Sequence, residues 1–229
     1  MTQENSNAGQ AALMQIQIIP VTPFQQNCSL IWETTTNKAA FVDPGGDSDQ
    51  LIAALEHFNL TLDRIWLTHG HLDHAGAAQT LKEKYDVPIE GPHKEDQWLL
   101  DDIEAQGAKY GFPGGRNTRS DRYLDDGDQL KLGEITFDVV HTPGHTPGHV
   151  VIYHQDAKIA FVGDVIFQGS IGRTDFPRGD HQTLLDSITQ KLWPLGEDMR
   201  FVPGHGNMSS FGQERKMNPY VSDSAMNRA

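Results

Sequence analysis

Apolar, often β-branched runs recur along this chain, and their short length and flanking turns predict buried strands. Three strand candidates lie within residues 15–42, and a fourth apolar run covers residues 64–67. Further strands are expected at residues 87–89, 123–124, 129–132, 135–140, 149–154, 159–163 and 200–202. Amphipathic spacing predicts helices at about residues 48–58, 75–85 and 181–193, whereas residues 93–120 are charged and include a glycine-rich loop.

The predicted elements fall into two blocks, each rich in strands and each with its own helices. This order predicts an α/β fold in which two mixed β-sheets pack face to face with helices on the outside. Residues 1–12 are polar and are expected to form a disordered tail. Residues 13–229 are expected to form one domain, since a chain of 229 residues is within the size of a single α/β domain.

Four of the apolar runs end in a histidine or an aspartate flanked by glycine or proline. The run at residues 64–67 leads to His69, and that at 135–140 leads through a glycine-containing turn to His145. The runs at 159–163 and near 200 end at Asp164 and His205. Turns at strand ends hold side chains firmly and leave them open to a cleft, so these residues predict a site at one rim of the sheets.

The sequence from His69 to His74 contains three imidazoles and one carboxylate within six positions. In a chain with 11 histidines a single His-x-His can arise by chance, but the added Asp73 and His74 favour a metal site. Imidazole and carboxylate are ligands of Zn²⁺ and its first-row neighbours, and an open catalytic zinc takes three of them. The run therefore predicts two metal ions side by side.

Composition limits the partners and the compartment. The formal charge of −13 argues against nucleic acid as a partner, although two divalent metals would still attract a small anionic substrate. Cys28 is the only cysteine, so no internal disulfide can form, and a cytoplasmic location is expected. No signal peptide is evident, and no apolar run approaches the roughly 20 residues of a membrane-spanning helix.

The pattern His69-x-His71-x-Asp73-His74, followed by His145, Asp164 and His205, resembles the signature of the metallo-β-lactamase superfamily, whose fold is an αββα sandwich. The resemblance implies that His69, His71 and His145 bind one metal. It implies that Asp73, His74 and His205 bind a second, and that Asp164 bridges the two. Asp43 matches an aspartate that supports a ligand imidazole from outside the donor set. The implied cofactors are two divalent ions, zinc above all, with iron or manganese as alternatives at the second position.

Two further stretches resemble the glyoxalase II-like branch, in particular its short bacterial members: residues 172–180, and the Glu-Arg-x-x-Asn-Pro-aromatic motif at 214–220. This resemblance implies hydrolysis of a thioester such as S-D-lactoylglutathione by a hydroxide between the metals, with Asp73 and Asp164 catalytic. It also implies that Arg173 contacts a carboxylate of glutathione, the alternative being a surface pair with Asp175. The chain ends soon after His205, without the helical domain that supplies glutathione contacts in full-length glyoxalase II.

Other functions remain open from the sequence. A mononuclear iron dioxygenase acting on glutathione persulfide would use His69, His145 and Asp164, two histidines and one carboxylate. Another thioester or a lactone is a further possible substrate. A non-catalytic metal-binding protein is the third reading, but no expected ligand is missing. The sequence does not predict the oligomeric state.

Overall fold

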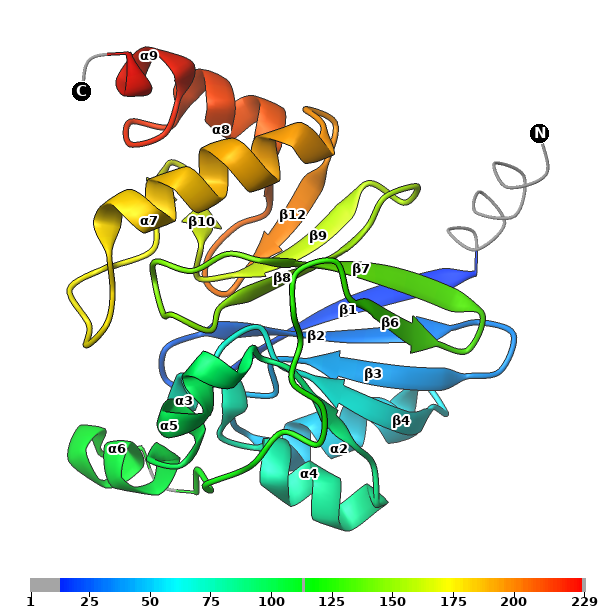
Figure 1. The fold of residues 1–229 in the computed structure, drawn as a ribbon. Coiled ribbons are helices and arrows are strands. Elements are labelled where there is room, and N and C mark those ends of the chain that lie inside the picture. Colours follow the sequence, from blue (N-terminus) through cyan, green and yellow to red (C-terminus); the bar gives the residue numbers. More distant parts are fainter. Residues whose placement is uncertain (1–12, 113, 228–229) are drawn as a thin grey trace.

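The computed structural model describes residues 13–112 and 114–227, so the expected disordered tail at residues 1–12 lies outside the described residues. Two β-sheets lie against each other, and helices cover their outer faces (Figure 1). The first sheet has the order β1-β2-β3-β4-β5 and the second the order β13-β12-β9-β8-β7-β6. This arrangement confirms the predicted αββα sandwich.

The first sheet is antiparallel from β1 to β3 and parallel from β3 to β5. Its strands are β1 (Met14–Val21), β2 (Gln26–Glu33), β3 (Lys38–Val42), β4 (Thr61–Trp66) and β5 (Ile89–Glu90). The helical segments that follow these strands in the chain are α2 (Ser48–His57), α3 (Leu72–Ala75), α4 (Ala78–Tyr85), η1 (Lys94–Asp96), α5 (Gln97–Leu100) and α6 (Ile103–Tyr110). Helices α2 and α4 lie on the outer face of this sheet (Figure 1).

The second sheet is antiparallel except between β9 and β12, which run parallel. Its strands are β6 (Gln129–Leu132), β7 (Ile135–His141), β8 (Val150–His154), β9 (Ile159–Gly163), β12 (Arg200–Pro203) and β13 (Ser209–Ser210). A separate hairpin contains β10 (Ile166–Phe167) and β11 (Ser170–Ile171). The outer helices are α7 (His181–Asp186), the π-helix η2 (Ser187–Leu192), the 3₁₀ turn η3 (Trp193–Leu195), α8 (Phe211–Met217) and α9 (Asp223–Met226).

The core consists of three apolar layers, one between the sheets and one under each set of helices. In β2, Leu30 faces the first helical layer and Ile31 the layer between the sheets. Strands such as this read as continuous apolar runs because both of their faces are buried. Trp66 and Phe137 join the sheets, with ring centroids 5.0 Å apart. Cys28, in β2, is buried in the first helical layer.

Several local predictions were wrong. The helix expected at 75–85 begins only at Ala78, as α4, and Ala75 instead ends the short helix α3. The segment 93–120, for which no helix was predicted, contains η1, α5 and α6. No strand forms at 123–124, where the neighbouring Arg122 makes an isolated bridge to Glu90. None of the described helices is long and apolar enough to cross a bilayer.

Candidate metal centre

The seven donor side chains expected from the sequence lie together at one rim of the two sheets. His69 follows β4, and Asp73 and His74 lie in α3, the first helix after that strand. Asp164 comes directly after β9, and His205 comes two residues after the parallel strand β12. The remaining two donors are His71, which precedes α3, and His145, in the loop between β7 and β8. The fold therefore brings together residues separated by up to 136 positions (205 − 69).

His69, His71 and His145 form the first donor group, with all three donor atoms within 4.8 Å of one another. The Nδ1 atom of His71 lies 3.1 Å from Nε2 of His69 and 3.0 Å from Nε2 of His145. Three ring nitrogens that converge in this way can be satisfied together by one cation, since zinc takes imidazole nitrogens at about 2.0–2.1 Å.

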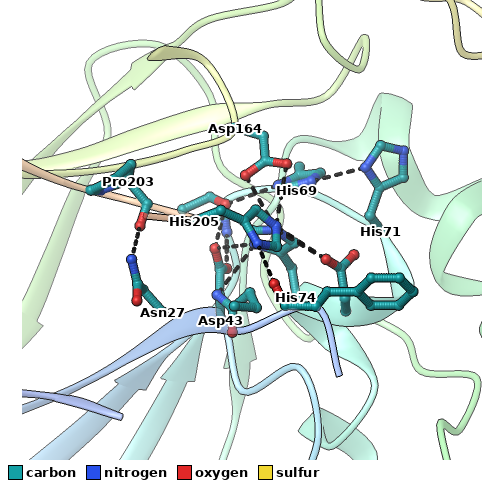
Figure 2. A network of polar contacts seen from close by, with 12 residues as sticks. Asn27, Asp43, His69, His71, His74, Asp164, Pro203 and His205 are labelled. Carbon is teal, nitrogen blue, oxygen red and sulfur yellow. Dashed lines mark hydrogen bonds and ion pairs between the residues drawn. The ribbon is translucent and has the colours of Figure 1, made fainter. Parts of the chain in front are cut away.

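Asp73, His74 and His205 form the second donor group, again with donor atoms within 4.8 Å. The Oδ2 atom of Asp73 lies 3.2 Å from Nε2 of His205 and 3.9 Å from Nε2 of His74. Figure 2 shows His74 and His205 of this group next to Asp164.

Asp164 faces both donor groups (Figure 2). Its Oδ2 atom lies 3.7 Å from Nε2 of His145, in the first group, and 3.7 Å from Nε2 of His205, in the second. Its Oδ1 atom lies 3.4 Å from Nε2 of His74. A carboxylate between two groups of nitrogen donors can contribute one oxygen to each of two neighbouring cations.

Asp43 supports two of the imidazoles from behind. Its Oδ2 atom accepts from Nδ1 of His74 at 2.9 Å and from the Thr68 hydroxyl at 2.6 Å, and its Oδ1 atom accepts from the Thr68 amide at 2.7 Å. The Thr68 hydroxyl in turn lies 3.1 Å from Nδ1 of His69 and can accept its proton. Both imidazoles are thereby held with Nε2 free to bind a metal. Both oxygens of Asp43 accept hydrogen bonds, although its donor atom also lies within 4.8 Å of those of His69 and His74, so its supporting role stays a prediction.

Backbone carbonyls orient two further imidazoles in the same way. Nδ1 of His145 donates to the carbonyl of Arg173 at 2.7 Å, and Nδ1 of His205 donates to the carbonyl of Phe24 at 3.1 Å. The loop that carries His205 is also tied to β2, because the Asn27 side chain donates to the carbonyl of Pro203 at 3.1 Å (Figure 2).

The first donor group is uncharged near neutral pH. Burial lowers the pKa of His71 to about 3, and the neighbouring His145 adds to this effect. Burial also lowers the pKa of His69 well below its ordinary value, and it lowers the pKa of His145. Neutral imidazole is the form that binds a metal, so no proton has to leave these three rings at pH 7.

The second donor group and Asp164 attract positive charge. Burial opposes protonation of His74, yet the carboxylates of Asp164 and Asp73 raise its pKa well above the ordinary value. Burial likewise acts to raise the pKa of Asp164, but the charge on His74 and the other imidazoles holds it far below the ordinary range. The carboxylates that stabilise a proton on His74 would stabilise a divalent cation in the same place.

Two atoms at the centre of the site are buried and have no hydrogen-bond partner: Nε2 of His74 and Oδ1 of Asp164. Gly204 leaves room for them, since a Cβ at that position would lie 2.1 Å from Oδ1 of Asp164 and 2.5 Å from Cε1 of His74. Buried polar atoms are normally paired, so these two are explained if each binds a cation. The residues present fit two divalent metal ions.

Arg173 lies at the rim, where its carbonyl holds His145 while its side chain turns outward. The guanidinium makes two hydrogen bonds to Asp175, at 2.9 and 2.7 Å, and both side chains are 66% exposed. The guanidinium carbon also lies 4.5 Å from the ring centroid of Phe176, whose ring is 5.0 Å from that of His71. The surface pair considered from the sequence is therefore present, next to the metal centre.

Two residues contribute to the site in ways that the sequence did not specify. His149 stacks on His69 with ring centroids 4.7 Å apart, and its Nε2 atom accepts from the Asp164 amide at 3.1 Å. Asp96, in the charged segment after β5, is fully buried and bonds to the loops of the first donor group. The sequence does not indicate this role, because Asp96 is one acidic residue in a charged segment.

Comparison with known proteins places the chain in a family. The pattern of the metallo-β-lactamase superfamily matches residues 21–205. The hydroxyacylglutathione hydrolase GloC of Haemophilus influenzae is 48% identical over 91% of this chain and 99% of its own length. The solved structure of BLEG-1, described as a B3 metallo-β-lactamase, has a TM-score of 0.84 at 38% identity and covers 90% of this chain and 99% of its own. That of TTHA1623, in a di-iron-bound form, has a TM-score of 0.82 at 33% identity and covers 90% and 100%. This chain therefore belongs to the metallo-β-lactamase superfamily, with the donor set of a metal-dependent hydrolase.

Proposed function

We propose that this protein is a dinuclear metal-dependent hydrolase that cleaves a thioester, with S-D-lactoylglutathione or a related glutathione thioester as its substrate. The position of Asp164, facing both donor groups at 3.4–3.7 Å, is the observation that carries the dinuclear centre. The 48% identity to a hydroxyacylglutathione hydrolase supports the choice of a thioester. We expect zinc in the first donor group and zinc, iron or manganese in the second.

Two divalent cations held by these donors would lower the pKa of a shared water and polarise the carbonyl group of the substrate. The protein's own residues set the geometry for this. His69, His71 and His145 offer neutral nitrogens to one cation, and Asp164 faces both cation positions and compensates their charge. Asp73 and Asp164 are the carboxylates we assign to catalysis, since their oxygens lie among the nitrogens of both groups.

Both donor groups have solvent-accessible members, which indicates where substrate enters. His71 is partly exposed in the first group, and the side chains of His205 and Asp73 are 28% and 19% exposed in the second, whereas those of His74 and His145 are 0% and 2% exposed. Phe24, whose carbonyl holds His205, is 49% exposed at the same opening. An exposed aromatic ring beside the metals is suited to contact the acyl part of a substrate.

Arg173 is proposed to bind a carboxylate of the thiol part of the substrate. Its guanidinium already holds a carboxylate, that of Asp175, in a bidentate arrangement at the rim of the site. A substrate carboxylate can replace Asp175 at low cost, because an ion pair exposed to water contributes at most about 1 kcal/mol.

The test is steady-state hydrolysis of S-D-lactoylglutathione by the purified, metal-loaded protein, followed by the loss of thioester absorbance. Turnover is expected, and a chelator should abolish it. Asp164→Asn should abolish turnover with the fold retained, whereas His57→Ala, an exposed change on α2, should not affect it. The Asn side chain keeps the shape but removes the negative charge between the two donor groups.

The same preparation separates the competing activities. Hydrolysis of a β-lactam without hydrolysis of any thioester would contradict the proposal, and the similarity to BLEG-1 makes this comparison necessary. One iron per chain together with oxygen consumption on glutathione persulfide would favour the dioxygenase. Hydrolysis of other thioesters or lactones in preference to S-D-lactoylglutathione would retain the chemistry and correct the substrate.

A further inference from the structure

Asp96 is a buried carboxylate outside the donor set, at the end of the 3₁₀ turn η1. Its side chain has no exposed surface. Within the part of the chain that the structure describes, it forms no ion pair with a lysine, arginine or histidine. A buried carboxylate without a cationic partner is costly unless hydrogen bonds compensate for lost water, so its presence requires an explanation.

Asp96 accepts three hydrogen bonds, all from the two loops that carry the first donor group. The amide of Gly70, between His69 and His71, donates to its Oδ2 atom at 3.0 Å. The hydroxyl of Thr146, the residue after His145, donates to the same oxygen at 2.6 Å. The amide of Gly148 donates to Oδ1 at 2.6 Å.

The packing around Asp96 leaves no space for other arrangements. A Cβ at Gly148 would lie 2.6 Å from the Asp96 amide nitrogen and 2.7 Å from its Cγ. A Cβ at Gly70 would lie 2.9 Å from the Asp96 carbonyl oxygen and 2.7 Å from Cβ of Leu99. The His93 amide adds a hydrogen bond to the Gly148 carbonyl at 3.0 Å. Both loops therefore lie directly against the turn that carries Asp96.

All three partners of Asp96 are donors, so the ionised carboxylate suits this position better than an amide. Burial raises the pKa of Asp96 to about 6, while the bonds from Thr146, Gly148 and Gly70 act in the opposite direction. An asparagine here would place its NH₂ group against at least one N–H or O–H donor.

We propose that Asp96 is a positioning residue for the first metal ion: it fixes the loop of His69 and His71 to the loop of His145, so that the three imidazoles stay at metal-binding separation. The inference rests on the dinuclear centre of the proposed function. It does not depend on the substrate, because Asp96 acts on the geometry of the three histidines themselves. Outer residues that fix ligands in this way typically contribute 10–100-fold to metal affinity.

The test is zinc binding to the metal-free protein, measured by competition with a chromophoric chelator, together with the Co²⁺ absorption spectrum of each variant. In Asp96→Asn we expect one of the two metal equivalents to bind about 10–100-fold more weakly and the other to be unchanged. The Co²⁺ spectrum should change for the weakened equivalent only. Glu95→Gln, an exposed change at the adjacent position, is the matched control and should bind both ions as the wild type does.

Thr146→Val provides a second, milder test in case Asp96→Asn does not fold. It removes one donor and keeps the shape, so it should weaken the same metal equivalent to a smaller extent. Two outcomes would overturn the inference. One is affinity and spectra like those of Glu95→Gln, and the other is equal weakening of both equivalents, with a lower melting temperature of the metal-free protein. If the wild type binds two metals but hydrolyses no thioester, the proposed function fails and the role of Asp96 is still measured.

Discussion

Asp43→Asn should weaken the second metal position while leaving the fold intact. Three donors converge on the Asp43 carboxylate: the amide and hydroxyl of Thr68, at 2.7 and 2.6 Å, and Nδ1 of His74, at 2.9 Å. An asparagine offers one acceptor oxygen and a donor NH₂ group in the same space.

In the Asp43→Asn variant, either orientation of the side-chain amide loses a favourable hydrogen bond. If the NH₂ group faces His74, that imidazole must accept at Nδ1 and carry its proton on Nε2, the atom that lies 3.4 Å from Asp164 and has to bind the metal. If the NH₂ group takes the position of Oδ1, it opposes the N–H of the Thr68 amide in a site where Asp43 is 3% exposed. An unsatisfied buried group costs about 1–3 kcal/mol. This range agrees with the 10–100-fold loss, about 1.4–2.8 kcal/mol, that is typical when an outer partner of a metal ligand is removed.

The assay is metal content after dialysis against a graded series of chelator concentrations, read by elemental analysis, with thioester hydrolysis measured alongside. One equivalent should be lost at about 10–100-fold lower chelator strength than in the wild type. Asp47→Asn is the matched control, because Asp47 also has a positive φ, 49°, and accepts a backbone amide, that of Thr22 at 2.7 Å, but lies outside the donor set. Retention of both ions by Asp43→Asn, as in this control, would refute the tautomer argument.

Four further predictions follow from the same geometry. His71→Ala removes one of three donors and should abolish hydrolysis with an unchanged circular dichroism spectrum; near-wild-type turnover would contradict a dinuclear mechanism. Arg173→Ala should raise KM several-fold with little change in kcat, since it removes binding common to ground and transition states; an unchanged KM would exclude this side chain from the site. Glu214→Ala removes the acceptor of the Gly169 amide, at 2.8 Å, and should destabilise the protein by about 1–3 kcal/mol in thermal melts, unlike the exposed Lys216→Ala on the same helix. The metal-free protein should lose stability as the pH falls below about 6.5, because the pKa of His71 drops from 6.5 when exposed to about 3 in the fold, so that only the unfolded chain binds its proton there. The pKa values of His69, His145 and His149 are lowered in the same direction, whereas those of His74 and His205 are raised and act in the opposite direction. A melting temperature that stays constant from pH 7 to pH 5 would contradict this last prediction.

The sheets, and the region where the seven candidate donors meet, could be predicted because both depend on local patterns. A strand with both faces buried is an apolar run that ends at a turn, and candidate donors follow four such runs. Asp164 follows β9 and His205 follows β12, two parallel neighbours in one sheet, so their closeness comes from strand order alone. The distances between the donor atoms, and the hydrogen bonds that orient each imidazole, become known only from the structure.

The helices between β5 and β6 could not be predicted in the same way. The segments η1, α5 and α6 have three, four and eight residues. Helices of this length are too short to show a clear period of 3.6 residues, and in isolation they are not stable. Their helical form depends on packing against α3 and the loops of the metal centre, which a local pattern does not contain. For the same reason the π-helix η2 was predicted as part of one regular helix.

Three of the buried carboxylates outside the donor set, Asp43, Asp96 and Glu214, show why such residues are not found from sequence motifs. Each is nearly or fully buried, and in the described part of the chain none forms an ion pair with a lysine or arginine. Each accepts hydrogen bonds from segments distant in sequence: 25 and 31 residues for Asp43, 26 to 52 for Asp96, and 45 for Glu214, which holds the Gly169 turn of the β10–β11 hairpin.

Asp96 is bound only by uncharged donors, and a buried carboxylate of this kind destabilises a fold unless positive charge lies nearby. Asp43 and Asp96 lie directly behind the donor groups, where two divalent cations would supply that charge. Binding of two such cations would therefore be coupled to ordering of the loops, because the carboxylates that fix the loops would be less costly once the cations are bound. The acidic residues that support the site and the cations bound in it would then stabilise each other.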